Sequence, residues 1–203
     1  TIGYLPQIQD PNQTILSLFD SQLSNPLAIL EKYYSAFTFD TSSGGEMTPN
    51  DHAIYIEGLN QQIEFLDAYN AYPKIEAALT RLGIGDIDLN RDFGTFSGGE
   101  QARILFALAT VTDPQIILLD EPTNNLDIQG KLTLQKALAN FKGAVVAVSH
   151  DRYFLDAACK QIVEFDGLNE HPMIWNGNYT DFVEQKEKFI EKLASDIAAQ
   201  DKY

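Results

Sequence analysis

The chain is poor in cysteine, in basic side chains and in long apolar runs: 203 residues hold one cysteine and 14 lysines and arginines against 29 acids. A lone Cys159 excludes a disulfide framework and does not favour a cysteine-based metal site. No apolar run approaches the roughly 20 residues that span a bilayer, so we expect no direct membrane insertion. No charged and then apolar leader opens the chain, so no secretory signal is expected. These absences fit a reducing, cytoplasmic location.

The net charge of −15 bears on possible partners. An acidic protein is repelled by nucleic acid unless its basic side chains are clustered, and no dense cluster occurs here. The imbalance is strong between Thr41 and Ile75, where Lys74 is the only lysine or arginine. The acids of this stretch are Glu46, Asp51, Glu57, Glu64 and Asp67.

The first half of the chain has a helical pattern. Ile2 to Leu5 predicts a short strand that ends at Pro6, and apolar residues recur at helical spacing from about Gln13 to Arg91. The polar stretch 41–51 interrupts this pattern and is typical of a loop. We predict a helix over Ile75 to Leu82 that ends at Gly83.

The second half changes period. The continuous apolar runs 116–119 and 144–148 are typical of parallel strands that are covered on both faces. A crossover helix is expected between them, over 128–141, which makes a βαβ unit. Residues 162–165 and 173–175 predict a closing hairpin, and a charged amphipathic helix is expected from Asp181 onward. The pattern therefore predicts an α/β fold with a parallel-sheet core.

Polar side chains follow both predicted parallel strands. The first run ends in Asp120 and Glu121, and the second in Ser149 and His150. Ligands of open α/β sheets gather at the carboxyl ends of strands. One carboxylate there suits Mg²⁺, a second suits activation of water, and a histidine suits a phosphate contact. Acids after a strand also simply begin loops, so this pattern alone leaves both readings open.

Ser97 and Glu100 form a capping box ahead of an apolar helical pattern, so a helix begins here. Gly98 and Gly99 would expose backbone N–H groups at the positive end of that helix, where a phosphate binds well. Capping boxes are common, so the motif alone also leaves the purely structural reading open.

Five segments resemble motifs of ABC-type ATPase nucleotide-binding domains. Residues 96–101 (Phe-Ser-Gly-Gly-Glu-Gln) resemble the signature motif, and residues 116–122 (Ile-Ile-Leu-Leu-Asp-Glu-Pro) resemble a Walker B strand with its catalytic glutamate. Residues 123–127 (Thr-Asn-Asn-Leu-Asp) are similar to the D-loop, and His150 stands in the place of the switch histidine. Residues 4–7 (Tyr-Leu-Pro-Gln) are similar to the strand and glutamine of the Q-loop.

Finer features resemble the ABC-F subfamily. Residues 149–156 are similar to its form of the switch region, and 175–182 to the start of its interdomain linker. Gln7 and Ser97 lie 90 positions apart, which resembles the first nucleotide-binding domain of ABC-F proteins, where an arm is inserted. Two departures are mild: Phe96 replaces a more usual leucine, and Asn125 a frequent histidine.

The resemblance implies a partial P-loop NTPase fold of the ABC type, with an inserted helical or arm subdomain and a C-terminal linker helix. It divides the chain into a core strand with the Q-loop (1–7), a helical subdomain (8–95) with an arm-like insertion at about 41–72, an ATPase core (96–178) and the start of a linker helix (179–203).

The resemblance also implies ATP and Mg²⁺ as cofactors, held between two nucleotide-binding domains of one polypeptide or of a dimer. The implied site consists of catalytic Glu121, His150 and Gln7; nucleotide-binding Ser97, Gly98, Gly99, Glu100 and Asp127; and the Mg²⁺ residues Asp120 and Gln7.

The family's phosphate-binding loop, Gly-x-x-x-x-Gly-Lys-Ser/Thr, does not occur in the 203 residues. The family's motif order puts it before the Q-loop, so we expect it upstream of Thr1. We therefore expect ATP hydrolysis from the intact protein and not from residues 1–203 alone.

Three functions stay open. The first is an ABC-F ATPase acting on the ribosome in translation or antibiotic resistance. The second is the ATPase subunit of an ABC membrane transporter, which shares every catalytic motif but not the long insertion or the linker-like helix. The third is a non-catalytic interaction fragment.

Overall fold

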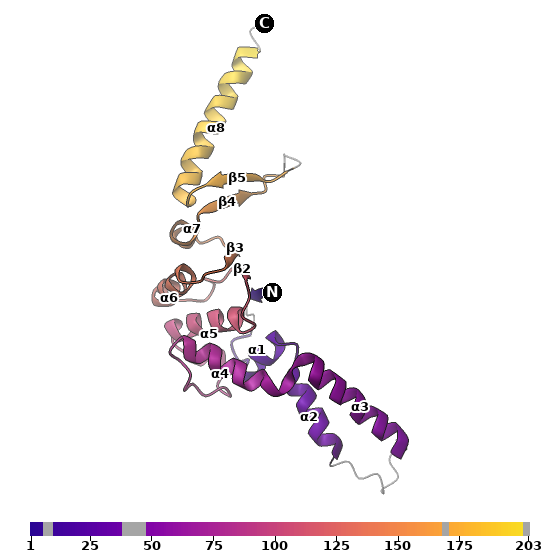
Figure 1. Ribbon diagram of the computed structural model, residues 1–203. Coiled ribbons are helices and arrows are strands. Elements are labelled where there is room, and N and C mark those ends of the chain that lie inside the picture. Colours follow the sequence, from indigo (N-terminus) through magenta and orange to yellow (C-terminus); the bar gives the residue numbers. More distant parts are fainter. Residues whose placement is uncertain (6–9, 38–47, 168–170, 201–203) are drawn as a thin grey trace.

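The computed structural model describes residues 1–5, 10–37, 48–167 and 171–200. Gln7 and most of the loop expected at 41–51 lie outside the described residues. A three-stranded parallel sheet, ordered β1-β2-β3, forms the centre of the molecule (Figure 1). Its strands are β1 (Ile2–Leu5), β2 (Ile116–Asp120) and β3 (Ala144–Val148).

The connection from β2 to β3 confirms the predicted βαβ unit. Helix α6 (Ile128–Ala139) lies between the two strands in sequence, and both neighbouring pairs of strands are parallel. Leu5 is paired with Leu119, and Asp120 with Val148, so the carboxyl ends of all three strands lie at one edge. The predicted α/β class is thereby confirmed.

One face of the sheet packs on helix α5 (Gly98–Thr110), and this contact forms the main core. Leu5, Ile117 and Leu119 point to this face and are buried. Gly3 shares the face, and a Cβ added there would overlap the carbonyl oxygen of Ala109. Helix α5 is itself buried over most of its length, because α6 and helix α4 (Ala71–Arg81) also contact it.

The opposite face of the sheet is exposed, so the expectation of strands covered on both faces was wrong for the described residues. Ile2, Tyr4, Val146 and Val148 alternate with the buried positions and remain open, Val148 to 62%. The physical reason is that the described helices that contact the sheet pack on the α5 side. A continuous apolar run therefore did not reveal how many of a strand's faces are covered.

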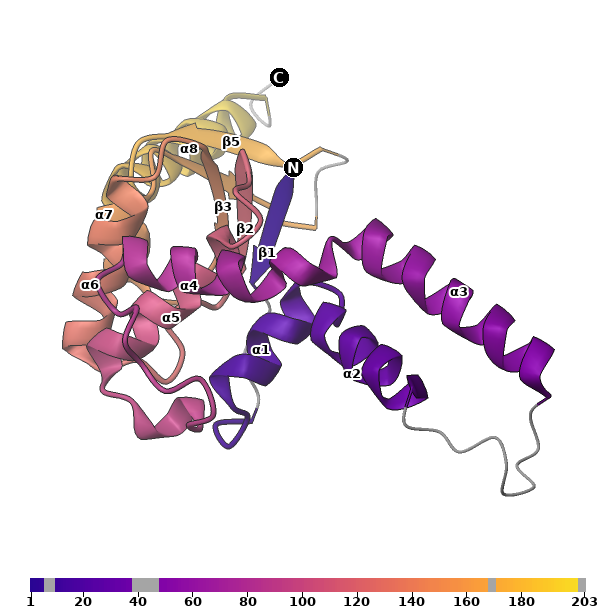
Figure 2. The ribbon, with the colours of Figure 1, turned by 60° about the horizontal axis from the view of Figure 1, so that its bottom comes forward.

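The helical first half forms a projecting hairpin. Helix α1 (Ile15–Gln22) lies near the core, while α2 (Pro26–Phe37) and α3 (Pro49–Leu66) run side by side away from it (Figures 1 and 2). The 3₁₀ turn η1 (Ala68–Asn70) returns the chain to α4, and η2 (Phe93–Thr95) precedes α5. Helix α4 ends before Gly83, as predicted, and Gly83 has a φ of 71°.

The start of α3 corrects the expected loop at 41–51. Thr48 accepts a hydrogen bond from the backbone N–H of Asp51, and the Asp51 carboxylate accepts one from the backbone N–H of Thr48. This capping box, with Pro49 in the first helical position, begins the helix inside the stretch predicted to be loop.

The last third consists of α7 (Arg152–Ala158), the antiparallel pair β4 (Gln161–Glu164) and β5 (Met173–Asn176), and α8 (Tyr179–Gln200). The pairing of β4 with β5 confirms the predicted hairpin. Trp175 makes edge-to-face contacts with Phe182 and Phe189, which fix the base of α8 on the hairpin. The rest of α8 projects from the body, at the opposite end from the α2–α3 hairpin (Figure 1). Within the described ranges, no helix is long and apolar enough to cross a membrane.

Candidate nucleotide-binding and catalytic site

The sheet places two groups of predicted site residues at its carboxyl edge. Asp120 is the last residue of β2, and Glu121 follows it. Ser149 and His150 follow β3, and Glu121 donates its backbone N–H to the carbonyl of Val148 at 2.8 Å. The register of the strands brings these groups to one edge of the sheet, as the sequence predicted. Gln7, expected after β1 at the same edge, is outside the described residues.

The Glu121 carboxylate lies against the backbone that follows β3. Its Oε2 accepts the backbone N–H of His150 at 3.3 Å and the hydroxyl of Ser149 at 3.4 Å. Both bonds are long, which is common for catalytic groups before a ligand is bound. Thr123, which is buried, shares a hydrogen bond with the Ser149 hydroxyl at 3.4 Å.

The second Glu121 oxygen, Oε1, is buried and has no hydrogen-bond partner among the described residues. The Nε2 atom of the His150 ring lies 3.6 Å from Oε1, too far for a hydrogen bond. The His150 side chain is 98% exposed, whereas that of Glu121 is only 14% exposed. A buried carboxylate oxygen without a partner calls for an explanation.

Glu121 also has an unusual backbone. Its φ of 45° lies in the left-handed region, where Asn and Asp are enriched but glutamate is not. Such a conformation costs of order 1–3 kcal/mol and is found at functional sites that are held by their surroundings. Here the bonds to residues 148–150 hold it. The strain and the unpartnered oxygen single out the same residue.

The serine-glycine turn forms a second group at the start of α5. Ser97 is the N-cap, and its hydroxyl accepts the N–H of Glu100 at 3.4 Å. The Glu100 carboxylate in turn accepts both the backbone N–H of Ser97 and its hydroxyl, at 2.9 and 2.7 Å. These bonds from Ser97 lower the pKa of Glu100. In this structure Glu100 shapes the turn, and its oxygens are engaged by Ser97.

Asp127 lies directly against this turn. It caps α6 by accepting the N–H of Gly130 at 2.7 Å. The same carboxylate fills the space where a Cβ on Gly98 would stand. A Cβ on Gly130 would come within 2.6 Å of the carbonyl oxygen of Gly98. The structure thus brings the predicted residues Gly98 and Asp127 together. Segment 122–126 connects this second group to Glu121.

Sequence reasoning missed an ion pair that joins the two groups. Lys131, in the first turn of α6, contacts Asp151 Oδ2 at 2.5 Å. Asp151 follows His150 and caps α7 through the N–H of Phe154. The hydrogen bond from Lys131 is the main reason that the pKa of Asp151 is lowered. Lys131 and Asp151 are 20 residues apart in sequence, so no local sequence pattern predicts their contact.

Asp120 fits a limited role toward Mg²⁺. No group of three metal-ligating side chains is present in the part of the chain that the structure describes. Mg²⁺ commonly keeps several waters and takes one or two carboxylates plus substrate phosphates. Asp120 at the open edge of the sheet suits one such contact.

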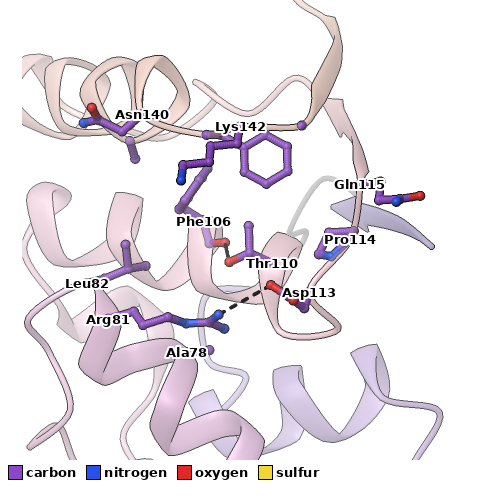
Figure 3. A pocket seen from close by; sticks show the side chains of 13 residues that line it. Ala78, Arg81, Leu82, Phe106, Thr110, Asp113, Pro114, Gln115, Asn140 and Lys142 are labelled. Atoms are coloured by element: carbon purple, nitrogen blue, oxygen red, sulfur yellow. Dashed lines mark hydrogen bonds and ion pairs between the residues drawn. The ribbon is translucent and has the colours of Figure 1, made fainter.

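A pocket of about 1040 Å³ lies elsewhere (Figure 3). Pro114, Gln115 and Gly143 line it, and they precede β2 and β3. The pocket is therefore at the amino ends of the strands, on the opposite side from Glu121. Arg81 and Asp113, which also line the pocket, form an ion pair of 3.6 Å. Because ligands of parallel sheets bind at the carboxyl ends, we do not assign the nucleotide to this pocket.

The fold and the motifs at this edge of the sheet are those expected of a nucleotide-binding ATPase domain, and comparison with known proteins gives its family. The profile of the family described as "ABC transporter" matches residues 3–124, more than half of the chain. The chain therefore belongs to the ABC transporter family of ATPase domains, as predicted from its motifs.

Curated relatives refine this assignment. The chain is 34% identical over 196 residues to the energy-dependent translational throttle protein EttA of Haemophilus influenzae, and 32% identical over 206 residues to EttA of Escherichia coli K12. These alignments cover 94% and 99% of this chain, but only 34% and 36% of the relatives. The tylosin resistance ATP-binding protein TlrC of Streptomyces fradiae is 32% identical over 168 residues, covering 82% of this chain and 31% of TlrC. EttA and TlrC are ABC-F ATPases, so the predicted subfamily is confirmed. The chain spans about a third of the length of these relatives.

Proposed function

We propose that this chain is part of an ABC-F ATPase that binds and hydrolyses ATP between two nucleotide-binding domains and acts on the ribosome. Glu121 carries the proposal, because its buried, unpartnered Oε1 lies at the strand edge beside His150. A carboxylate so placed suits a base that orients and deprotonates an attacking water. Its left-handed backbone is consistent with a role that outweighs local strain.

The remaining residues of the site take supporting roles in this proposal. His150 would hydrogen-bond the terminal phosphate, and Asp120 and Gln7 would order Mg²⁺ and water. The cation, when bound, supplies charge that offsets the phosphates.

The signature residues are proposed to serve the second composite pocket. Ser97, Gly98 and Gly99 would present the turn at the start of α5 to a nucleotide held mainly by the other domain. Glu100 would keep that turn in shape, as its bonds to Ser97 support. Asp127 would connect this turn with the opposite pocket, which its position against Gly98 supports.

The test is Glu121→Gln in the intact protein. Glutamine keeps the size and the hydrogen-bond acceptor, but it cannot take a proton. We expect the ATP hydrolysis rate to fall by at least a hundredfold, the lower end of general-base effects, while nucleotide binding persists. Glu184→Gln on the exposed side of α8 removes the same charge and should leave hydrolysis unchanged. Turnover of Glu121→Gln within about tenfold of wild type, about 1.4 kcal/mol of barrier, would refute the assigned role.

Action on the ribosome rests on the relatives and on the long insertion. The names of the relatives refer to translational throttling and to tylosin resistance. We propose that helix α3 belongs to the arm-like insertion expected at about 41–72. Helix α3 carries Asp51, Glu57 and Glu64 and no lysine or arginine. Its charge therefore favours contact with a basic protein surface over RNA.

Co-sedimentation with purified ribosomes tests this part of the proposal. The intact Glu121→Gln protein should sediment with ribosomes in ATP and not without nucleotide. Absence of co-sedimentation in ATP, together with normal ATP hydrolysis by wild type, would favour a transporter ATPase subunit instead. Absence of ATPase activity in the wild-type protein would leave the non-catalytic reading.

A further inference from the structure

The first turn of α6 contacts both groups of the site at once. On one side, Asp127 and Gly130 pack against Gly98 at the start of α5. On the other side, Lys131 reaches Asp151 beside His150. A single turn of helix therefore lies between the serine-glycine turn and residues 149–151 around His150, which we call the histidine segment.

The location of Lys131 is not explained by the helix itself. A cation in the first turn faces the positive end of the helix dipole, which disfavours it by a few tenths of a kcal/mol or more. The Asp151 carboxylate compensates for this at 2.5 Å, and its side chain is only 14% exposed. Partial burial makes this pair stronger than an exposed surface ion pair.

Asp151 connects Lys131 to the histidine segment through hydrogen bonds. Its Oδ1 accepts the N–H of Phe154, and its own N–H donates to the Ser149 hydroxyl at 3.1 Å. Ser149 in turn donates to Glu121. The exposed ring of His150 has no packing to hold it, so the backbone on either side of it sets its place.

We propose that Lys131 is a positioning residue that fixes the histidine segment relative to the start of α6. Through Asp151 it holds His150 and Glu121 in a fixed position relative to the serine-glycine turn. It thereby couples the two composite pockets. This inference rests on the proposed ATPase function and adds a residue that none of the motifs contains.

The test is steady-state ATP hydrolysis by the intact protein with Lys131→Met, Lys131→Arg and Asp151→Asn. We expect Lys131→Met to lower kcat about tenfold with KM for ATP within twofold, because positioning affects the transition state more than ground-state binding. Lys131→Arg, which keeps the cation, should recover at least half of the wild-type rate. Asp151→Asn keeps a cap for α7. When it is combined with Lys131→Met, the double variant should have a kcat no lower than that of Lys131→Met alone.

Lys136→Met is the matched control, because it removes an exposed lysine from the same helix and should leave kcat unchanged. Thermal unfolding of every variant separates positioning from misfolding. The inference is overturned if Lys131→Met keeps kcat within twofold, if arginine does not rescue, or if the loss of rate follows a loss of folded protein. An inactive wild-type protein, or an active Glu121→Gln variant, would instead reject the proposed function. These two measurements therefore distinguish failure of the proposed function from failure of the inference about Lys131.

Discussion

Gly98 and Gly99 are neighbours in one motif, but the structure predicts opposite results when each becomes alanine. A Cβ on Gly98 would overlap the Asp127 carboxylate, whereas a Cβ on Gly99 would meet only the Thr133 hydroxyl at 3.8 Å, an ordinary contact. Neither glycine has a positive φ, so alanine is allowed by the backbone at both positions. The comparison therefore isolates the contact with Asp127.

The magnitudes follow from three effects. Alanine in place of glycine within a helix stabilises it by up to about 1 kcal/mol, and both variants gain this. Gly98→Ala must also displace a carboxylate that is bound to the N–H of Gly130. Losing that cap costs about 1 kcal/mol, and crowding a packed contact costs a further ~1–3 kcal/mol. We expect Gly99→Ala to be slightly stabilising and Gly98→Ala to be less stable than it by about 2–4 kcal/mol.

Thermal unfolding of the intact protein without nucleotide measures the difference. At roughly 2–4 °C per kcal/mol for a domain of this size, the two Tm values should differ by about 4–16 °C. Amide hydrogen exchange gives a local measurement, because the N–H of Gly130 should lose protection in Gly98→Ala and keep it in Gly99→Ala. Equal Tm values, or unchanged protection of Gly130 in Gly98→Ala, would refute the argued packing of Asp127 on the turn.

Two further predictions concern charge and capping. Ser97→Ala removes the cap of α5 and should lower the free energy of unfolding by about 1 kcal/mol, as measured by denaturant titration. Because the pKa of Asp151 is lowered in the folded state, the stability that it contributes is present above the unfolded value of about 3.9 and is lost as pH falls below it. Wild type should therefore exceed Lys131→Met in stability between pH 5 and 8, and the difference should shrink below about pH 4. A difference that grows toward low pH would contradict this.

Sequence alone determined the features that depend on neighbouring residues. Apolar runs predicted β2 and β3, and the Ser97–Glu100 spacing predicted the start of α5, because the apolar pattern of a strand and the capping of a helix depend on residues a few positions apart. Thr48 and Asp51 also have the spacing of a capping box. The polar residues around them are typical of a loop, so the helix start was not predicted there. The order of the motifs also predicted the family, and the family match confirmed it.

Only the tertiary structure decided which side of the sheet is covered, how Glu121 is held and what touches Asp127. Val148 is open while Ile117 is buried, although both stand in equally apolar runs, because burial depends on which helices pack on a face. Glu121 meets residues 28 and 29 positions away, and Lys131 meets a carboxylate 20 positions away. Such contacts arise when the chain folds back on itself, and they leave no periodic trace in the sequence.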